Sequence, residues 1–291
     1  MRDHAAVRTR VGSGVLDAVR STLDPVLWTF LHDRRAELAA MDPAAATLVD
    51  ELERVIRAGG KRVRPALCYW AYRAAGGADG EPIARACSAV ELVHTSAIVH
   101  DDVMDRTSER RGQPATHVRF AEQAPSGVDP EGFGISAAIL VGDLALALSD
   151  RAMRESGFAE NVLRVALVRF DRMRLEMAAG QFLDISGSPD RDRVAALKSS
   201  SYTAEGPVLV GAALAGAGAG PEGSLRAYAG LLGQAFQLRD DVLDAEAPPE
   251  AARSVDRLLG EAVAELGGAL DAEARAALAE IAGGLRLAEA G

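Results

Sequence analysis

The chain has 291 residues, of which 48% are hydrophobic, 4% aromatic and 25% charged, and its formal net charge is −10. This length and apolar content suit one large domain with a substantial core, while the acidic balance argues against nucleic acid as the main partner. Only two cysteines are present, which excludes a disulfide framework. The N-terminus lacks an apolar signal core, and no uncharged apolar run reaches about 18 residues, so we expect a cytoplasmic protein without a transmembrane segment.

The residue pattern predicts an all-α fold, because alanine and leucine dominate and β-branched runs are few. Without an internal linker, residues 1–291 are expected to form a single helical bundle. Pro25 is expected to divide the first helical stretch, 15–38, into two helices. A polar turn is predicted over 106–117 and an exposed loop over 121–134. Further helical stretches are predicted at about 48–58, 65–75, 82–105, 135–157, 161–185, 207–217, 222–244, 251–266 and 271–287. Pro189 and Asp190 are expected to begin another segment, which holds Lys198.

Two of these helices end in the same acidic pattern. The stretches HTSAIVHDDVMD (94–105) and FQLRDDVLD (236–244) each place three aspartates at i, i+1 and i+4. On a helix the first and last share a face, and carboxylates packed so closely repel one another unless a cation lies among them. Magnesium uses such sites together with water and substrate phosphate. One DDxxD alone would be a solvated acidic helix end, but two copies after long apolar helices predict a magnesium-dependent enzyme acting on a diphosphate.

Six motifs occur in the order found in the trans-isoprenyl diphosphate synthases, the polyprenyl synthetase family. Besides the two acidic stretches they are GGKRVRP (59–65), RRGQP (110–114), GDLAL (142–146) and GQFLD (180–184). The resemblance covers about 48–244, and within the family the chain resembles the geranylgeranyl diphosphate synthases. It implies a helical bundle around a central cavity, commonly a homodimer, that joins isopentenyl diphosphate to an allylic prenyl diphosphate.

The resemblance also implies the metal chemistry. It implies Mg²⁺, three ions per active site, with Mn²⁺ able to substitute. Breaking the allylic C–O bond leaves a diphosphate anion and a carbocation, and groups that meet the developing negative charge lower that barrier. Asp244 lies one turn further along the helix than Asp240 and Asp241, and it is expected to assist these two carboxylates in holding the metal. The expected metal-binding and catalytic carboxylates are Asp101, Asp102 and Asp105 on one wall and Asp240, Asp241 and Asp244 on the other.

The basic and amide residues of the motifs are expected to bind the substrates. Arginine fits phosphate with a planar donor fork and lysine with a point charge. Solvated turn charges are the alternative, but the chain's two lysines both fall on positions that the family uses. For Gln181 a structural role is equally compatible, and His100 is expected to be structural. The resemblance assigns Gly60, Lys61, Arg64, His94 and Arg111 to isopentenyl diphosphate, and Arg110, Gln181, Lys198 and Gln237 to the allylic substrate or its surroundings, with Lys198 as a catalytic residue.

Small residues before the first acidic motif predict a long product. Helical spacing backward from Asp101 places Ala97, Val93 and Val90 on one face, as a lining for the prenyl tail. In the family, bulky aromatics four and five positions before the first aspartate favour a C15 product. Ala97 and Ser96 occupy those positions here, so a C20 or longer product is expected. A floor supplied from neighbouring helices, by Phe158 or Phe170, is the alternative.

The chain departs from the family pattern after Asp244, where a lysine-bearing loop is replaced by a shortened segment without lysine. Arg239 or Arg253 could replace part of that charge. The preferred function is a magnesium-dependent prenyltransferase acting on isopentenyl diphosphate. The first alternative, a class I terpene synthase-like enzyme that needs no isopentenyl diphosphate, has no use for the motif residues assigned to that substrate. The second, a weakly active partner subunit of a prenyl synthase, does not explain why all six aspartates are present.

Overall fold

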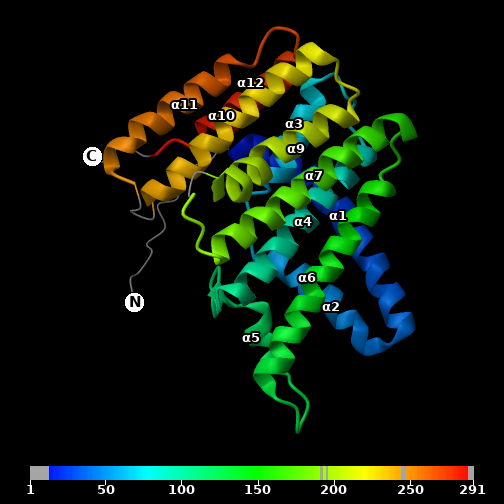
Figure 1. Cartoon of the computed structure of the whole chain (residues 1–291). Coiled ribbons are helices and arrows are strands. Elements are labelled where there is room, and N and C mark those ends of the chain that lie inside the picture. Colours follow the sequence, from blue (N-terminus) through cyan, green and yellow to red (C-terminus); the bar gives the residue numbers. More distant parts are fainter. Residues whose placement is uncertain (1–12, 191–192, 195, 244–246, 288–291) are drawn as a thin grey trace. The chain divides into compact units, whose positions relative to one another are not determined.

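The computed structural model describes residues 13–190, 193–194, 196–243 and 247–287 (Figure 1). Their regular secondary structure is helical apart from one short hairpin, which confirms the all-α prediction. They group into two compact units. Of the described residues, unit 1 comprises 13–19, 63–79 and those from 158 to 287, and unit 2 comprises 20–62 and 80–157.

Helix α1 (Ser13–Met41) is continuous, so the prediction that Pro25 divides it is wrong. A proline inside a helix costs about 3 kcal/mol, through one lost hydrogen bond and a steric clash. Leu23, Leu27 and Leu31 are fully buried at helical spacing on both sides of the proline. Since burying one leucine contributes about 1.5–3 kcal/mol, the three together outweigh the cost of the proline.

In unit 2, α4 and α6 pack closely because a glycine lies at their contact. The nearest atom to a Cβ placed on Gly142 would be His100 Nε2, at 2.1 Å. The same nitrogen lies 3.2 Å from the carbonyl oxygen of Ile139. His100 is therefore a packed structural residue, as the sequence predicted. The elements of unit 2 beyond α1 are η1 (Pro43–Ala45), α2 (Ala46–Arg57), α4 (Glu81–Met104), β1 (Glu109–Arg110), β2 (Gln113–Pro114), α5 (Thr116–Ala121) and α6 (Pro130–Arg154).

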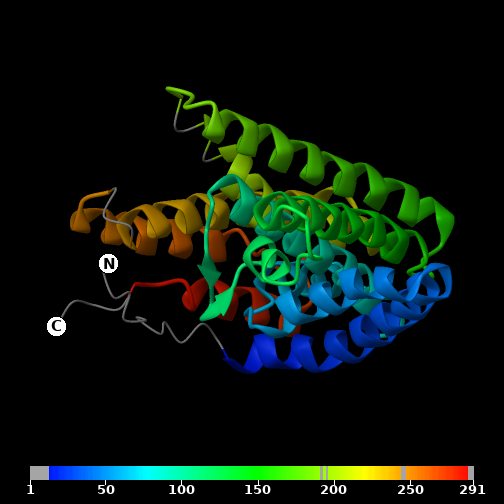
Figure 2. The same cartoon turned by 90° about the horizontal axis from the view of Figure 1, so that it is seen from below.

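The region 106–134 is more ordered than the sequence predicted. The predicted turn contains the antiparallel pair β1–β2, drawn as arrows in Figure 2, followed by α5. Helix α6 begins at Pro130, inside the predicted loop. Its start is fixed because the Asp129 carboxylate accepts a hydrogen bond from the Gly132 N–H at 3.0 Å, and because Pro130 occupies a first-turn position where a proline is tolerated.

Helix α6 is also the one described helix that is long and apolar enough to cross a membrane by length and composition. Its most apolar window has a mean hydropathy of 1.8, and 44% of that window is buried inside the protein. Core helices pass the same test, and α6 is packed against α4 and α5. Packing thus explains the buried apolar residues of α6, while Ile139 and Leu140 on the same helix are exposed.

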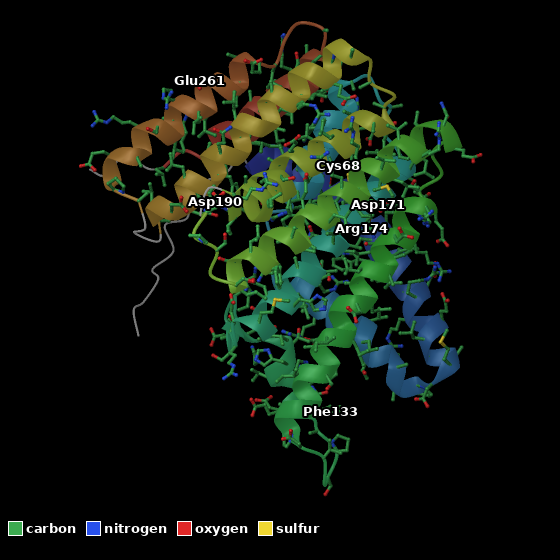
Figure 3. The ribbon with its side chains drawn as sticks, in the orientation of Figure 1. Cys68, Phe133, Asp171, Arg174, Asp190 and Glu261 are labelled. Carbon is green, nitrogen blue, oxygen red and sulfur yellow. The ribbon has the colours of Figure 1, made fainter. Side chains whose placement is uncertain are left out.

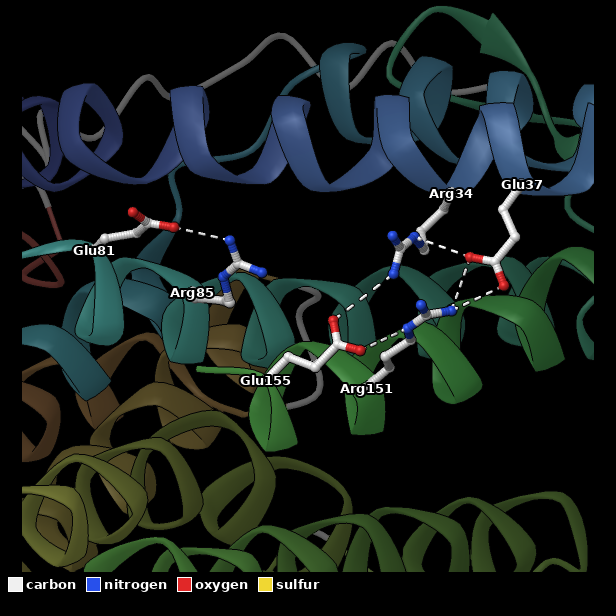
Figure 4. Close-up of polar contacts among 6 residues, drawn as sticks. All are labelled: Arg34, Glu37, Glu81, Arg85, Arg151 and Glu155. Carbon is white, nitrogen blue, oxygen red and sulfur yellow. Dashed lines mark hydrogen bonds and ion pairs between the residues drawn. The ribbon is translucent and has the colours of Figure 1, made fainter. Parts of the chain in front are cut away.

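Ion pairs tie α1 to α6 within unit 2 (Figure 4). Arg151 on α6 lies 2.8 Å from Glu37 on α1 and 2.9 Å from Glu155 at the end of its own helix. Arg34 lies 3.3 Å from Glu37 and 3.7 Å from Glu155. Partly exposed pairs of this kind contribute little stability each, so they orient the two helices more than they hold them together.

In unit 1, α9 packs against α3 and α7 through glycines. A Cβ on Gly211 would lie 2.1 Å from the carbonyl oxygen of Cys68 on α3, and one on Gly206 would lie 2.4 Å from Met173 Cγ on α7. Figure 1 shows α10 beside α11. The elements of unit 1 are α3 (Val63–Ala74), α7 (Glu160–Ile185), the π-helical segment η2 (Ala196–Glu205), α9 (Gly206–Leu214), α10 (Ala219–Leu243), η3 (Pro249–Ala251), α11 (Ala252–Ala264) and α12 (Ala272–Gly283).

Candidate substrate and metal site

The predicted site residues fall in both units. Asp244 lies outside the described residues, and so does the side chain of Lys198, whose backbone belongs to η2. Unit 2 carries Gly60, Lys61, His94, Arg110, Arg111 and the first acidic group, and unit 1 carries Arg64, Gln181, Lys198, Gln237 and the second acidic group.

The first acidic group ends α4 and surrounds an arginine. Arg110, on β1, donates from Nε to Asp102 Oδ1 at 2.7 Å, and its Nη2 lies 3.5 Å from Asp101 Oδ2. The Asp102 side chain is 5% exposed and that of Asp101 29%. Burial lowers the pKa of Arg110, but the hydrogen bond and charge of Asp102, with the charges of Asp101 and Asp105, outweigh it and raise that pKa above its ordinary value. The two carboxylates therefore converge on a cation.

The hairpin β1–β2 presents Arg110 and Arg111. Its two turn residues, Arg111 and Gly112, have φ angles of 56° and 74°, the positive values that a tight two-residue hairpin turn requires. Arg54 on α2 holds the second strand, donating to Gln113 Oε1 at 3.0 Å and to the carbonyl oxygen of Pro114 at 3.2 Å. The position of the turn arginine is thus determined by a helix some 60 residues earlier in the chain.

Glu51 in turn holds Arg54, and sequence reasoning missed both residues. The buried Glu51 carboxylate accepts hydrogen bonds from Arg54 Nη2 at 2.6 Å and from Thr116 Oγ1 at 2.8 Å. The signal that could have found this pair is the i, i+3 spacing of a carboxylate and a guanidinium on the apolar face of α2. An acid on a buried stripe needs a partner, because an unpaired buried charge is costly.

The glycine turn at 59–60 lies against two guanidinium groups. Gly59 and Gly60 have φ angles of 126° and 153°. A Cβ on Gly60 would lie 3.0 Å from Arg62 Nη1 and 3.5 Å from Arg111 Nη1, so only glycine leaves this space open. The fully buried Arg62, also missed in the sequence, donates to Glu91 Oε1 at 2.8 Å and thereby fixes the turn.

Among the described residues, Arg62 and Arg110 are paired with carboxylates, whereas the guanidinium of Arg111 is available to bind a ligand. Within the described part of the chain its guanidinium makes no hydrogen bond or ion pair. Burial lowers the pKa of Arg111; the charge of Glu91 opposes this, and the charges of Arg110 and Arg62 add to it. A bound anion would offset that repulsion. Arg111 lines a cavity of about 20 Å³ with Arg54, Arg110, Asp102 and Ile98 among its neighbours.

The residues expected to set product length lie on the inner face of α4. Val90, Val93 and Ser96 are buried, and Ala97 is half-buried. Phe158 and Phe170, the alternative floor, belong to unit 1. Phe158 packs edge-on against Tyr72, and Phe170 is fully buried beneath the guanidinium of Arg174. The role of all these residues in product length stays a prediction.

The second acidic group ends α10. Gln237 donates from Nε2 to Asp241 Oδ1 at 2.6 Å, and Arg239 donates from Nη1 to Asp240 Oδ1 at 3.1 Å. Both donors belong to the same helix as their acceptors. Gln181, expected beside the allylic substrate, is half-buried near the end of α7. Helix α11 begins at Ala252, and the shortened segment expected after Asp244 stays a prediction.

The donor chemistry fits magnesium. Among the described residues no three His, Cys, Asp or Glu side chains are arranged together as a metal site. Magnesium does not require such a cluster, because it is commonly held by one or two carboxylates, with water and substrate phosphate completing its shell. Asp101 and Asp102, which already converge on the guanidinium of Arg110, supply two such carboxylates.

The polyprenyl synthetase family model matches residues 45–256. The chain therefore belongs to the polyprenyl synthetase family. A short chain isoprenyl diphosphate synthase from Methanothermobacter thermautotrophicus is 32% identical over 242 residues, which cover 81% of this chain and 69% of that enzyme. Geranylgeranyl pyrophosphate synthase 11, chloroplastic, from Arabidopsis thaliana is 36% identical over 217 residues, 68% of this chain and 56% of that protein. Such relatives support the assignment of this chain as a prenyltransferase.

Solved structures show the same fold. A geranylgeranyl pyrophosphate synthase from Corynebacterium glutamicum, crystallised with isoprenyl diphosphate and magnesium, has a TM-score of 0.81 at 24% identity, over 93% of this chain and 97% of that one. An FPP/GFPP synthase from Zymomonas mobilis has a TM-score of 0.73 at 25% identity, over 92% and 98% of the two chains.

Proposed function

We propose that this chain is a magnesium-dependent prenyltransferase that condenses isopentenyl diphosphate with an allylic diphosphate. The observation that carries the proposal is the charge arrangement in unit 2. A guanidinium without a hydrogen-bonded partner among the described residues, that of Arg111, lines a cavity with Asp102, whose carboxylate belongs to the acidic end of α4. An anion-binding group beside a cation-binding group suits a metal-bound diphosphate.

The chain's own residues would bind and orient the two substrates. Lys61, Arg64, His94 and Arg111 would hold the diphosphate of isopentenyl diphosphate, and Gly60, which has no Cβ, lets the guanidinium groups of Arg62 and Arg111 lie close to the backbone. Asp101 and Asp102 would hold the metal ion, which when bound supplies electrostatic stabilisation of the leaving diphosphate. The allylic C–O bond breaks with its electron pair going to the diphosphate, which leaves an allylic cation. The isopentenyl double bond attacks this cation to form the new C–C bond, and the resulting tertiary cation gives a proton to the released diphosphate and so regains a double bond.

The second acidic group and the amide side chains would act on the allylic substrate. Asp240 and Asp241 would supply further carboxylates to metal ions, with Gln237 orienting Asp241 through its hydrogen bond. Arg110, Gln181 and Lys198 would contact the allylic diphosphate. The proposal includes Asp105 as a metal ligand with Asp101 and Asp102, Asp244 as a supporting acid, three Mg²⁺ ions in all, and Mn²⁺ as a substitute.

We also propose a product of C20 or longer. The lining of α4 that leads away from Asp101 contains small side chains at Ala97 and Ser96, followed by Val93 and Val90. No aromatic side chain on this stretch closes the path of a growing prenyl tail. Relatives named geranylgeranyl diphosphate synthase support this length.

A homodimer is the proposed assembly, and an exposed apolar stripe on α7 supports it. Val168, Leu175 and Phe182 repeat at seven-residue spacing and are 63%, 71% and 66% exposed. Asp171 and Arg174, an ion pair within the helix, lie along the same element (Figure 3). Large exposed apolar side chains in a row are typical of a surface that a partner covers.

One assay tests the function. The purified chain is incubated with Mg²⁺ and dimethylallyl, geranyl or farnesyl diphosphate, with and without isopentenyl diphosphate, and the products are identified by mass spectrometry. We expect longer diphosphates only when both substrates are present, and none after EDTA treatment until Mg²⁺ is restored. Hydrocarbon or alcohol from the allylic substrate alone would point to a terpene synthase-like enzyme. Turnover only after addition of a second, different chain would indicate a partner subunit.

A further inference from the structure

Two consecutive residues of η2 hold the side chain of Arg64. Arg64 Nη2 donates to the hydroxyl of Thr203 at 2.8 Å. The guanidinium carbon lies 4.6 Å from the centre of the Tyr202 ring, within the range of a cation–π contact. Thr203 and Tyr202 are both buried. One side chain thus accepts a hydrogen bond from the guanidinium while its neighbour covers that group's face.

The π-helical form of η2 explains how neighbours in sequence reach the same group. A π-helix closes its hydrogen bonds from i to i+5, so each residue turns the chain by less than in an α-helix. Successive side chains therefore point in more similar directions. π-Helical segments are rare, and most are single-turn bulges inside α-helices, which occur frequently at functional sites. In η2 this geometry places a hydroxyl and an aromatic ring together against one arginine.

The segment η2 is itself fixed within unit 1. Ser201 donates a hydrogen bond to Glu176 on α7. Glu205, the last residue of η2, accepts from Arg226 Nη1 on α10 at 3.0 Å. Arg64 is therefore held against a segment that two long helices anchor, and its guanidinium is restrained before any ligand arrives.

We propose that Thr203 and Tyr202 are positioning residues for isopentenyl diphosphate, acting through Arg64. The inference rests on the proposed function, in which Arg64 binds that diphosphate. An arginine side chain loses rotamer freedom when it binds a ligand, and a site that has already restrained it binds more tightly. Both residues should therefore affect the affinity for isopentenyl diphosphate and leave the affinity for the allylic substrate unchanged.

A pair of nearly isosteric variants tests the hydroxyl. Thr203→Val removes it at nearly constant volume, and Thr203→Ser keeps it. We expect Thr203→Val to raise both the KM for isopentenyl diphosphate and its Kd, measured by isothermal titration calorimetry on the full chain, by about tenfold. Thr203→Ser should restore affinity to within about twofold. The kcat and the KM for the allylic substrate should change little in either variant.

A second pair tests the ring. Tyr202→Phe keeps the aromatic face and should bind isopentenyl diphosphate like the wild type, whereas Tyr202→Leu should weaken binding by about threefold to fivefold. Combining Thr203→Val with Arg64→Met shows whether the threonine acts through the arginine. If it does, Thr203→Val causes no further loss once Arg64 has been replaced.

The outcomes separate the two proposals. If the wild-type chain neither binds nor consumes isopentenyl diphosphate, or if Arg64→Met binds it as well as the wild type, the assignment of Arg64 fails and the inference fails with it. If Arg64→Met weakens binding but Thr203→Val and Tyr202→Leu do not, the inference alone is wrong. Equal weakening by Thr203→Val and Thr203→Ser, or a lower melting temperature with unchanged Kd, would likewise overturn it. If Thr203→Val does not fold, the Tyr202 pair decides.

Discussion

Asp101 and Asp102 are adjacent in sequence but differ in environment. Asp102 is nearly enclosed and lies 2.7 Å from Arg110, whereas Asp101 is more open and lies 3.5 Å from the same guanidinium. The more open carboxylate has more room to exchange its contact with arginine for a metal ion. The environment of Asp101 thus suits a metal ligand, and that of Asp102 suits a residue that also holds the hairpin in place.

Asp101→Ala is expected to raise the barrier of the chemical step by several kcal/mol, because it removes charge that would hold a metal ion against the leaving diphosphate. The kcat at saturating Mg²⁺ and substrates should fall by about two to four orders of magnitude. Asp50→Ala, which removes an exposed carboxylate paired with Arg35, is the matched control and should retain activity. Activity of Asp101→Ala within a few fold of the wild type would refute the role.

At the scale of elements, close helix contacts in both units depend on glycines, which have no side chain. Gly142 admits His100 between α4 and α6 in unit 2, and Gly211 lets α9 approach the backbone of α3 in unit 1. The hydrophobic pattern predicted these helices, since each has its own periodic apolar residues. It did not predict which glycines mark the contacts, because that depends on which helix lies opposite.

Gly211→Ala is expected to destabilise the protein by about 2 kcal/mol or more. The added methyl group would lie 2.1 Å from a backbone carbonyl oxygen, so a helix must shift. Gly230→Ala, on α10, is the matched control: nothing lies within 4 Å of its Cβ position, and the better helix propensity of alanine should stabilise it by up to about 1 kcal/mol. Thermal melts followed by circular dichroism measure both. A melting temperature for Gly211→Ala at or above that of the wild type would show that α9 and α3 do not pack this closely.

At the scale of the whole molecule, the exposed stripe on α7 concerns assembly. Within the described residues, it brings together several of the most exposed large apolar side chains. A stripe of this kind would be an aggregation liability on a monomer. An isologous contact between two copies of α7 would cover the same surface on both chains, as twofold symmetry requires.

Leu175→Asp is expected to convert the proposed dimer to a monomer, because it places a charge in the middle of the apolar stripe without a partner. Sedimentation velocity or light scattering after gel filtration measures the mass. Met41→Asp, at an equally exposed apolar position on α1, should leave the dimer intact. The assembly proposal is wrong if the wild type is monomeric, or if Leu175→Asp sediments as a dimer.

The helices and the acidic motifs could be predicted from the sequence because each depends on residues that lie close together in the chain. Apolar periodicity predicts helices, and two DDxxD patterns with their basic companions predict a diphosphate chemistry whatever lies around them. Pro25 and the segment 106–134 were predicted wrongly. In the first case packing outweighed a local helix breaker, and in the second a hairpin and two helix starts depend on capping and tertiary contacts.

The contacts that hold the site residues in place could be identified only from the tertiary structure. Arg54 reaches the hairpin, Arg62 reaches Glu91, and Arg64 reaches Thr203 across 139 positions of sequence. A local pattern identifies which residues carry charge, since charge belongs to the side chain itself. It does not identify the partner of each charge, because a hydrogen bond depends on the distance between atoms, and that distance exists only once the helices have packed.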